Sequence, residues 1–348
     1  VIYDVNGFAG YIMQKVNDAS PLTVLYSKNI YDLRYRLIVA LNLCIALEGI
    51  HKENQVCGDL NPQNICVNLN KDDKQKGFHV TLVDVDSYHF RTGENVYRCE
   101  VGQGYYLAPE LHKKMTNGKT LINVSLPTYT QETDLFALAV HIFMLLMNGC
   151  HPFACARKDT DNIPQVSKVN NNDSLIAPQP IDNIRDGFFT FYDKREDISI
   201  PIYAPDFLCL PWQLQKLFLR SFKDGYQDPK LRPTATEWIQ GLKQFQEKSS
   251  YIQCAKGHFY FNNGQMGCPF CKVVEQAQRM MDEEKGVYKK EDDNLSITND
   301  NFYDSCSDEK ANNIFGKVKL IYVCKVLLII LCLFFLLLIT YCCNTSYS

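Results

Sequence analysis

Residues 135–147 form an almost wholly apolar stretch, and this stretch constrains the fold more than any other part of the sequence. A helix that is apolar on every side has to be buried on every side, so the stretch predicts a central helix with a domain packed around it. The pair Asn148-Gly149 suits the C-terminal end of that helix. At 348 residues and 46% hydrophobic composition, the chain is long and apolar enough to build such a domain.

Both helices and strands are predicted around this central helix. Apolar residues recur at helical spacing from Leu33 to Leu47 and predict a helix over residues 32–52. Two short apolar runs, 64–68 and 79–83, flank a polar turn and predict a β-hairpin with a long tip. Three further segments are predicted: an N-terminal hairpin over 1–16, a surface loop over 158–187 and two helical patterns within 211–247. The expected fold class is therefore α+β.

Polar residues with the chemistry of a phosphoryl-transfer site follow the first helix and the hairpin. Phosphoryl transfer needs an acidic group to orient the attacking hydroxyl, and oxygen ligands to hold Mg²⁺ on the phosphates. Asp59 and Asn64 lie between the helix and the first strand, and Asp84 follows the second strand. Because Asp and Asn are also common in turns and helix caps, a purely structural role is the alternative for these three residues.

The segment from Asp59 to Asn64, Asp-Leu-Asn-Pro-Gln-Asn, resembles the catalytic loop of the protein kinases, whose usual form is His-Arg-Asp-Leu-Lys-x-x-Asn. The resemblance places Asp59 as the catalytic base, and Asn64 and Asp84 as the Mg²⁺ ligands. Three more matches follow in kinase order: Ala108-Pro109-Glu110 of the motif that closes the activation segment, Asp134 before the apolar helix, and Arg232, which pairs with the Glu of that motif. The resemblance covers residues 1–247. It implies a protein-kinase-like fold in which Glu110, Asp134 and Arg232 are structural.

Three other segments resemble a bacterial-type branch of the kinases in which a kinase-like domain precedes a Cys/His zinc module: Asp84-Val85-Asp86-Ser87-Tyr88, Cys99-Glu100-Val101-Gly102 and Gly149-Cys150-His151-Pro152-Phe153. The chain also departs from the usual kinase pattern. Cys57-Gly58 replace the usual His-Arg, and Asn61, predicted to be part of the catalytic site, stands where Ser/Thr kinases carry a phosphate-contacting Lys. After Asp84, Val85-Asp86 replaces the usual Phe-Gly. Asp86 is either a second metal ligand or a structural residue.

The parts of a kinase N-terminal lobe are not recognised in the sequence. There is no Gly-rich phosphate loop, no strand Lys of kinase type and no matching helix Glu. If residues 1–13 are the last strands before the hinge, the adenine-binding hinge is predicted at four residues: Met13, Gln14, Lys15 and Val16. The rest of the N-terminal lobe is then expected either to precede Val1 or never to have existed in this protein.

Two close pairs of metal-binding side chains predict a second site. Cys254 and His258 form the first pair, and Cys268 and Cys271 the second. Two such pairs on opposed turns suit tetrahedral Zn²⁺, and four protein ligands leave no open position, so the zinc is expected to be structural. The alternative is free thiols beside a surface His. The predicted zinc ribbon covers residues 251–273.

The C-terminal sequence predicts a membrane anchor. Residues 326–343 are uncharged and almost wholly apolar, and with the apolar residues before them they are long enough to span a bilayer, which needs about 20 residues. One transmembrane helix is therefore predicted over 318–343, after a polar, acidic segment, 274–317, that predicts a disordered linker. Lys residues precede the span and no Lys or Arg follows it, so the kinase-like domain is predicted to be cytoplasmic.

Together these patterns predict a membrane-anchored protein kinase that transfers the γ-phosphoryl group of ATP to Ser/Thr hydroxyls of a protein substrate. The implied cofactors are ATP, Mg²⁺ and a structural Zn²⁺. One alternative is a catalytically inactive pseudokinase scaffold that binds partners through its lobe and its zinc module. The other is a zinc-dependent nucleic-acid binder, against which the formal net charge of −3 argues, since nucleic-acid-binding surfaces are normally basic.

Overall fold

Helix α4 (Gln131–Leu146) lies at the centre of the fold, and every residue from Thr133 to Leu146 is buried. The computed structural model describes residues 2–284 except for 6, 11, 13–14, 17–18, 28–31, 71, 73–76, 116–118, 126–127, 158–176 and 265–266. Helix α4 ends just before Asn148 and Gly149, whose positive φ angles of 56° and 74° turn the chain away from the helix. The prediction of a central, wholly buried helix is confirmed.

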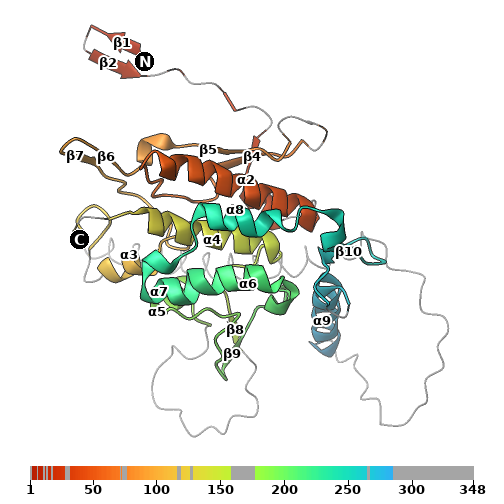
Figure 1. The fold of residues 1–348 in the computed structure, drawn as a ribbon. Helices are drawn as coiled ribbons and strands as arrows, with labels where there is room; N and C mark the ends of the chain where they lie inside the picture. Colours follow the sequence, from red (N-terminus) through yellow and green to blue (C-terminus); the bar gives the residue numbers. More distant parts are fainter. Residues whose placement is uncertain are drawn as a thin grey trace, which may run out of the picture. The chain divides into compact units, whose positions relative to one another are not determined.

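Helix α2 (Leu33–Lys52) packs against both α4 and α8 (Ala235–Lys243), as Figure 1 shows. It begins at Asp32, whose carboxylate accepts a hydrogen bond from the backbone N–H of Arg34 at 2.9 Å. Its apolar side chains are buried against these helices, so the pattern that predicted a helix over 32–52 is confirmed.

A three-stranded antiparallel sheet has the order β3 (Ala19–Pro21), β4 (Ile65–Asn68) and β5 (Val80–Leu82). Strands β4 and β5 are the hairpin that the two apolar runs predicted. The backbone N–H of Val83 donates to the carbonyl of Asn64 at 2.9 Å, so the pairing continues past the strands. Asn64 and Asp84 are therefore brought together at the open end of this hairpin. Strand β3 was not predicted, because a short strand containing a proline carries no apolar alternation.

The other elements are short. Two form the predicted N-terminal hairpin: β1 (Ile2–Asp4) and β2 (Gly7–Gly10). Further short elements include α1 (Thr23–Ser27), η1 (Val85–Ser87), β6 (Phe90–Thr92), β7 (Asn95–Tyr97), α3 (Pro109–Lys114), β8 (Ala156–Arg157), α5 (Pro180–Asp186), β9 (Ile198–Ser199), η2 (Phe207–Cys209), α6 (Trp212–Leu219), the π-helical turn η3 (Arg220–Asp224), α7 (Gly225–Gln227), η4 (Pro229–Leu231) and η5 (Lys248–Ser250). Helix α5 lies inside the segment 158–187, which was predicted to be a loop throughout, and 158–176 lies outside the described residues.

A cluster of aromatic side chains fills the core below α4. The ring of Phe143 contacts the rings of Phe191 and Phe218 with centroids 4.8 Å and 5.1 Å apart, both edge to face. Phe218 in turn packs on Trp238 at 4.9 Å. Burying one such side chain contributes roughly 1.5–3 kcal/mol, so this cluster ties the C-terminal helices to the central one.

The Cys/His segment forms a small hairpin and a helix: β10 (Tyr251–Gln253), β11 (Phe259–Phe261) and α9 (Pro269–Glu284). Its hairpin packs on the helical core. Phe261 is 2% exposed and belongs to the main hydrophobic cluster, and the guanidinium of Arg34 lies 3.4 Å from the centroid of the Phe259 ring. Helix α9 runs through residues 274–284, the first part of the predicted linker. The rest of that linker lies outside the described residues.

The expected membrane helix requires a correction to the predicted fold class and localisation. Residues 318–343 lie outside the described residues, and within the described ranges no helix is both long enough and apolar enough to cross a membrane. The most apolar one, α4, has 16 residues, about 24 Å at about 1.5 Å per residue, against a hydrocarbon core of about 30 Å. The longer α2 carries charged residues at both of its ends. What the structure supports is a mixed arrangement of helices and strands with a Cys/His cluster.

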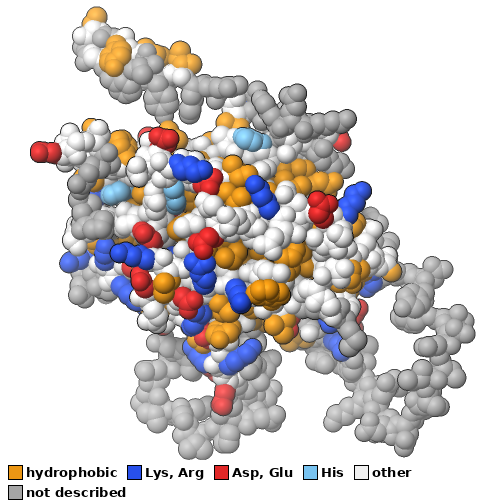
Figure 2. Space-filling model, in the orientation of Figure 1, with side chains coloured by type: hydrophobic (Ala, Val, Ile, Leu, Met, Phe, Trp, Pro, Cys, Tyr) orange, Lys and Arg blue, Asp and Glu red, His pale blue; other side chains and the backbone are white. Residues whose placement is uncertain are grey.

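The surface carries charges of both signs. On the face drawn in Figure 2, acidic and basic side chains are interspersed among apolar ones. Some are paired, as in Arg195 with Asp197 and Lys223 with Asp193, both at 2.7 Å.

Candidate active site and metal centre

The loop between α2 and β4 is organised by Asn61, whose side chain is turned into the loop. Its amide nitrogen donates to the carboxylate of Asp59 at 2.8 Å. Its carbonyl oxygen accepts from the backbone N–H groups of Gln63 and Asn64 at 2.9 Å and 3.3 Å. Asn61 is only 3% exposed. The position that holds a phosphate-contacting Lys in Ser/Thr kinases is therefore occupied here by a residue that shapes the loop.

Asn64 and Asp84 meet at the end of the β4–β5 hairpin. The amide nitrogen of Asn64 lies 3.1 Å from the carbonyl of Asp59 and 3.5 Å from a carboxylate oxygen of Asp84. Asp84 is exposed and has a left-handed backbone, with φ 63° and ψ 45°. The hydroxyl of Ser87 donates to its carboxylate at 3.0 Å. Such a conformation is unfavourable for a non-glycine residue and is found disproportionately at functional sites.

Asp59 is half-buried in this loop, and its ionisation is affected by its surroundings. Burial raises the pKa of its carboxyl, hydrogen bonds from the Asn61 side chain and the Gln103 backbone lower it, and the nearby Asp84 carboxylate raises it again, with a net rise above the ordinary value. A carboxylate with a raised pKa is a better proton acceptor than an ordinary Asp. The structure thus brings Asp59, Asn64 and Asp84 close to one another.

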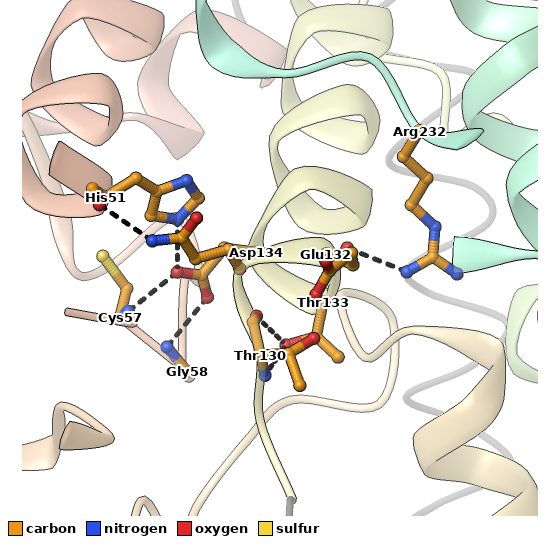
Figure 3. Close-up of polar contacts among 9 residues, drawn as sticks. His51, Cys57, Gly58, Thr130, Glu132, Thr133, Asp134 and Arg232 are labelled. Atoms are coloured by element: carbon orange, nitrogen blue, oxygen red, sulfur yellow. Dashed lines mark hydrogen bonds and ion pairs between the residues drawn. The ribbon is translucent and has the colours of Figure 1, made fainter. Parts of the chain in front are cut away.

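Asp134, at the start of α4, holds the backbone before Asp59 (Figure 3). Its fully buried carboxylate accepts from the backbone N–H groups of Cys57 at 2.8 Å and Gly58 at 2.9 Å, and from the His51 ring at 3.0 Å. Three donors on one carboxylate provide strong, charge-assisted hydrogen bonds. This contact fixes the chain immediately before the predicted catalytic base.

Gly58 has a physical reason to replace the usual Arg. Its φ of 77° is left-handed, which favours glycine. A β-carbon at this position would lie 2.7 Å from the Sγ atom of Cys99, too close for an unstrained contact. The glycine at this position therefore follows from close packing between the loop that contains Asp59 and the segment around Cys99.

Arg232 joins three parts of the fold. Its guanidinium forms two hydrogen bonds of 2.7 Å with the Glu110 carboxylate and donates to the carbonyls of Glu132 and Gly225, both at 2.8 Å (Figure 3 shows the Glu132 contact). The Arg232 side chain is fully buried, whereas that of Glu110 is 27% exposed. The pair that the resemblance implied is thus present as a bidentate ion pair.

His141, in the middle of α4, is a residue of this region that sequence reasoning missed. One ring nitrogen, Nε2, lies 2.8 Å from the carbonyl of Leu60, next to Asp59, and the other, Nδ1, lies 2.6 Å from the hydroxyl of Tyr26. Burial lowers the pKa of His141 to about 4. The available signal was a titratable residue inside an otherwise apolar stretch, which has to find polar partners when it is buried.

A loss of stability in acid is expected from this buried ring. The unfolded His takes up its proton near pH 6.5 and the folded one near 4, so the unfolded state binds more protons between these values. The free energy of unfolding therefore falls as the pH drops from 6.5 to 4, by roughly 3 kcal/mol from this residue alone. In His141→Gln, the free energy of unfolding measured with urea should therefore fall less steeply with pH, losing roughly 3 kcal/mol less between pH 6.5 and 4 than in the wild type. His79→Gln, at an exposed imidazole, should keep the wild-type slope, and equal slopes in all three proteins would contradict the assignment.

The predicted hinge is only partly described. Lys15 and Val16 are exposed, and Met13 and Gln14 lie outside the described residues.

The four residues predicted to bind zinc converge on one point. The ligand atoms of Cys254, His258, Cys268 and Cys271 all lie within 4.8 Å of one another. The Nδ1 atom of His258 is 3.6 Å, 3.7 Å and 3.4 Å from the three Sγ atoms, and two of the sulfurs are 3.8 Å apart. Tetrahedral Zn²⁺, with bonds of about 2.3 Å to sulfur and about 2.0 Å to nitrogen, has ligand–ligand distances of about 3.5–3.8 Å. The donor set and its spacing therefore fit zinc.

The thiols of this cluster affect one another's ionisation. Burial, and after it the neighbouring Cys268, raise the pKa of Cys271 to about 12. Burial also raises the pKa of Cys254, but hydrogen bonds from the backbone of His258 and Lys256 outweigh it, so the net shift is downward. Three thiols held this close ionise together only when a cation offsets their mutual repulsion.

Comparison with known proteins identifies distant relatives among bacterial kinases. The chain is 24% identical over 280 residues to "Protein kinase YegI" of Escherichia coli O157:H7, and equally to the protein of that name in Escherichia coli strain K12. The match covers 77% of this chain but only 38% of each relative. No protein-family model matches the chain. The similarity, together with the meeting of Asp59, Asn64 and Asp84, supports a kinase-like family.

Proposed function

We propose that this chain carries the catalytic lobe of a protein kinase that transfers the γ-phosphoryl group of ATP to Ser/Thr hydroxyls of a protein substrate. The observation that carries the proposal is the proximity of Asp59, Asn64 and Asp84 at one end of the β4–β5 hairpin, where the Asn64 side chain lies 3.5 Å from the Asp84 carboxylate and 3.1 Å from the backbone carbonyl of Asp59. Residues 1–247 form the proposed kinase-like part, and residues 251–273 the proposed zinc ribbon.

Each residue of this group has a role that its surroundings support. Asp59, with its raised pKa, would orient the acceptor hydroxyl and take up its proton. Asn64 and Asp84 would hold Mg²⁺, which when bound offsets the charge of the phosphates. Their oxygen atoms are the hard ligands that Mg²⁺ prefers, and Asp84 is exposed, as a metal ligand shared with ATP has to be. Asn61 would keep the Asp59 carboxylate in place, through its bond of 2.8 Å.

The remaining predicted residues have supporting roles in this proposal. Asp134 would fix the catalytic loop, and Glu110 with Arg232 would hold the end of the activation segment to the C-terminal helices. The Cys/His cluster would bind a structural Zn²⁺. Residues 13–16 remain the proposed adenine-binding hinge.

A catalytically inactive scaffold that binds protein partners is the second candidate, and one observation favours it. Asn61 stands in place of the phosphate-contacting Lys, and both ends of its carboxamide are engaged inside the loop. A loop without this cation stabilises the transferred phosphoryl group less well, since positive charge at that point offsets the charge of the transition state.

Calorimetry and a phosphotransfer assay on the full-length protein with Mg-ATP separate the two candidates. Mg-ATP binding together with new phosphate on Ser or Thr, located by mass spectrometry, is the expected result. Binding without phosphotransfer would favour the scaffold. If the protein neither binds Mg-ATP nor transfers phosphate, the kinase proposal is rejected. Phosphate found on Tyr alone would reject the Ser/Thr specificity but keep the reaction.

A further inference from the structure

The catalytic loop is held to helix α4 on both sides of Asp59. Before Asp59, the carboxylate of Asp134 accepts from two backbone N–H groups. After it, the carbonyl of Leu60 lies 2.8 Å from Nε2 of His141. Asp134 and His141 are two helical turns apart, so they share one face of α4. One contact is an acceptor and the other a donor, matching the backbone groups that the loop presents to the helix.

The contacts of His141 allow only one arrangement of its proton. The Leu60 carbonyl can only accept a hydrogen bond, so the ring hydrogen is on Nε2. Nδ1 is then an acceptor, and it receives the hydroxyl hydrogen of Tyr26 at 2.6 Å. The ring is fully buried, which keeps it neutral at physiological pH. Tyr26 thus selects the tautomer that can hold Leu60.

The plane of the ring is held as well. Tyr106 stacks on His141 with centroids 4.7 Å apart and planes 17° from parallel. Tyr106 belongs to the segment that leads into Ala108-Pro109-Glu110, the motif that closes the activation segment in kinases. Three separate parts of the chain therefore contact this one ring: α1, the catalytic loop and the segment before α3.

We propose that His141 is a positioning residue for phosphotransfer: by holding the Leu60 carbonyl, it directs the Asp59 carboxylate toward the acceptor hydroxyl. The Leu60 carbonyl belongs to the peptide group that joins Leu60 to Asn61. The Asn61 side chain donates to the Asp59 carboxylate at 2.8 Å, so a turn of this peptide group would shift the carboxylate through Asn61. The inference rests on the proposed function, and it assigns to this site a residue outside the catalytic loop.

The test compares three variants for kcat, for the KM of ATP and for thermal stability. His141→Phe keeps a ring of similar size but loses both hydrogen bonds, and we expect kcat to fall by about 10- to 100-fold with a small change in KM. His141→Gln keeps an N–H donor that can reach Leu60, and it should recover most of kcat. Val140→Ala, in the adjacent buried position of α4, should lower the melting temperature and leave kcat close to wild type.

Amide hydrogen exchange of the loop tests, in the absence of substrate, whether His141 holds the loop in place. The backbone N–H groups of Asn61 and Asn64 donate within the loop, to carbonyls 2.9 Å and 3.1 Å away. Their exchange should be faster in His141→Phe and restored in His141→Gln. If kcat and loop exchange in His141→Phe match those of Val140→Ala, the positioning role is overturned. If the wild type transfers no phosphate, the proposed function fails, and loop exchange alone still decides whether His141 holds the loop.

Discussion

Replacing Asp84 with Asn is expected to lower phosphotransfer by about 10³-fold or more, because an anionic ligand of the catalytic metal is lost. Asn has the shape of Asp and can still accept a hydrogen bond from Ser87, so the backbone at φ 63° should persist. Asn also tolerates the left-handed region well. The thermal transition should therefore stay close to wild type while kcat falls.

Rates measured over a range of Mg²⁺ concentrations show whether metal binding is the cause. Asp84→Asn should need more Mg²⁺ for half-maximal rate. Asp72→Asn, at an exposed carboxylate on the turn between β4 and β5, is the matched control and should behave as wild type. Asp86→Asn tests whether Asp86 is a second metal ligand. If it is, this variant should also need more Mg²⁺ for half-maximal rate; if Asp86 is structural, the Mg²⁺ dependence should match that of the wild type. Undiminished labelling in Asp84→Asn would mean that the metal role is misassigned.

Removal of zinc is expected to unfold the Cys/His segment and to destabilise the helices on which it packs. In zinc-finger peptides, metal binding supplies roughly 10–16 kcal/mol of folding free energy, and this hairpin is too small to replace that with a core of its own. Phe261 is part of the main core and Phe259 lies under Arg34, so loss of the hairpin exposes apolar surface of the helical lobe. A chelator should lower the melting temperature substantially.

Metal analysis and a matched substitution test this expectation. Mass spectrometry under native conditions should find one Zn²⁺ in the wild type and none in Cys271→Ser. Cys155→Ser is the control, since Cys155 is half-buried and lies outside the cluster, where a serine hydroxyl can keep the contacts with Pro178 and Asn183. If the purified protein contains no zinc, or if the chelator leaves the melting curve unchanged, the proposed zinc site is wrong.

Elements set by local burial patterns were predicted well. The helix over 32–52 has a helical period of apolar residues, the central helix is apolar on every side, and the β4–β5 hairpin consists of two apolar runs around a polar turn; each is found where expected. Short elements such as β3 and α5 have too few residues for a period, so sequence reasoning missed them. The membrane span was inferred from local apolar content alone, and no helix within the described residues supports it.

The sequence by itself determined which residues have the chemistry for phosphotransfer and for zinc. The order of Asp59, Asn64 and Asp84, and the spacing of the Cys/His pairs, are local facts about the chain, and side-chain chemistry does not depend on packing. Only the tertiary structure decided how those residues are held. Gly58 is required by Cys99, and Leu60 is held by His141, 81 residues away. Contacts of that kind depend on which surfaces meet in the folded core, and no local pattern records this.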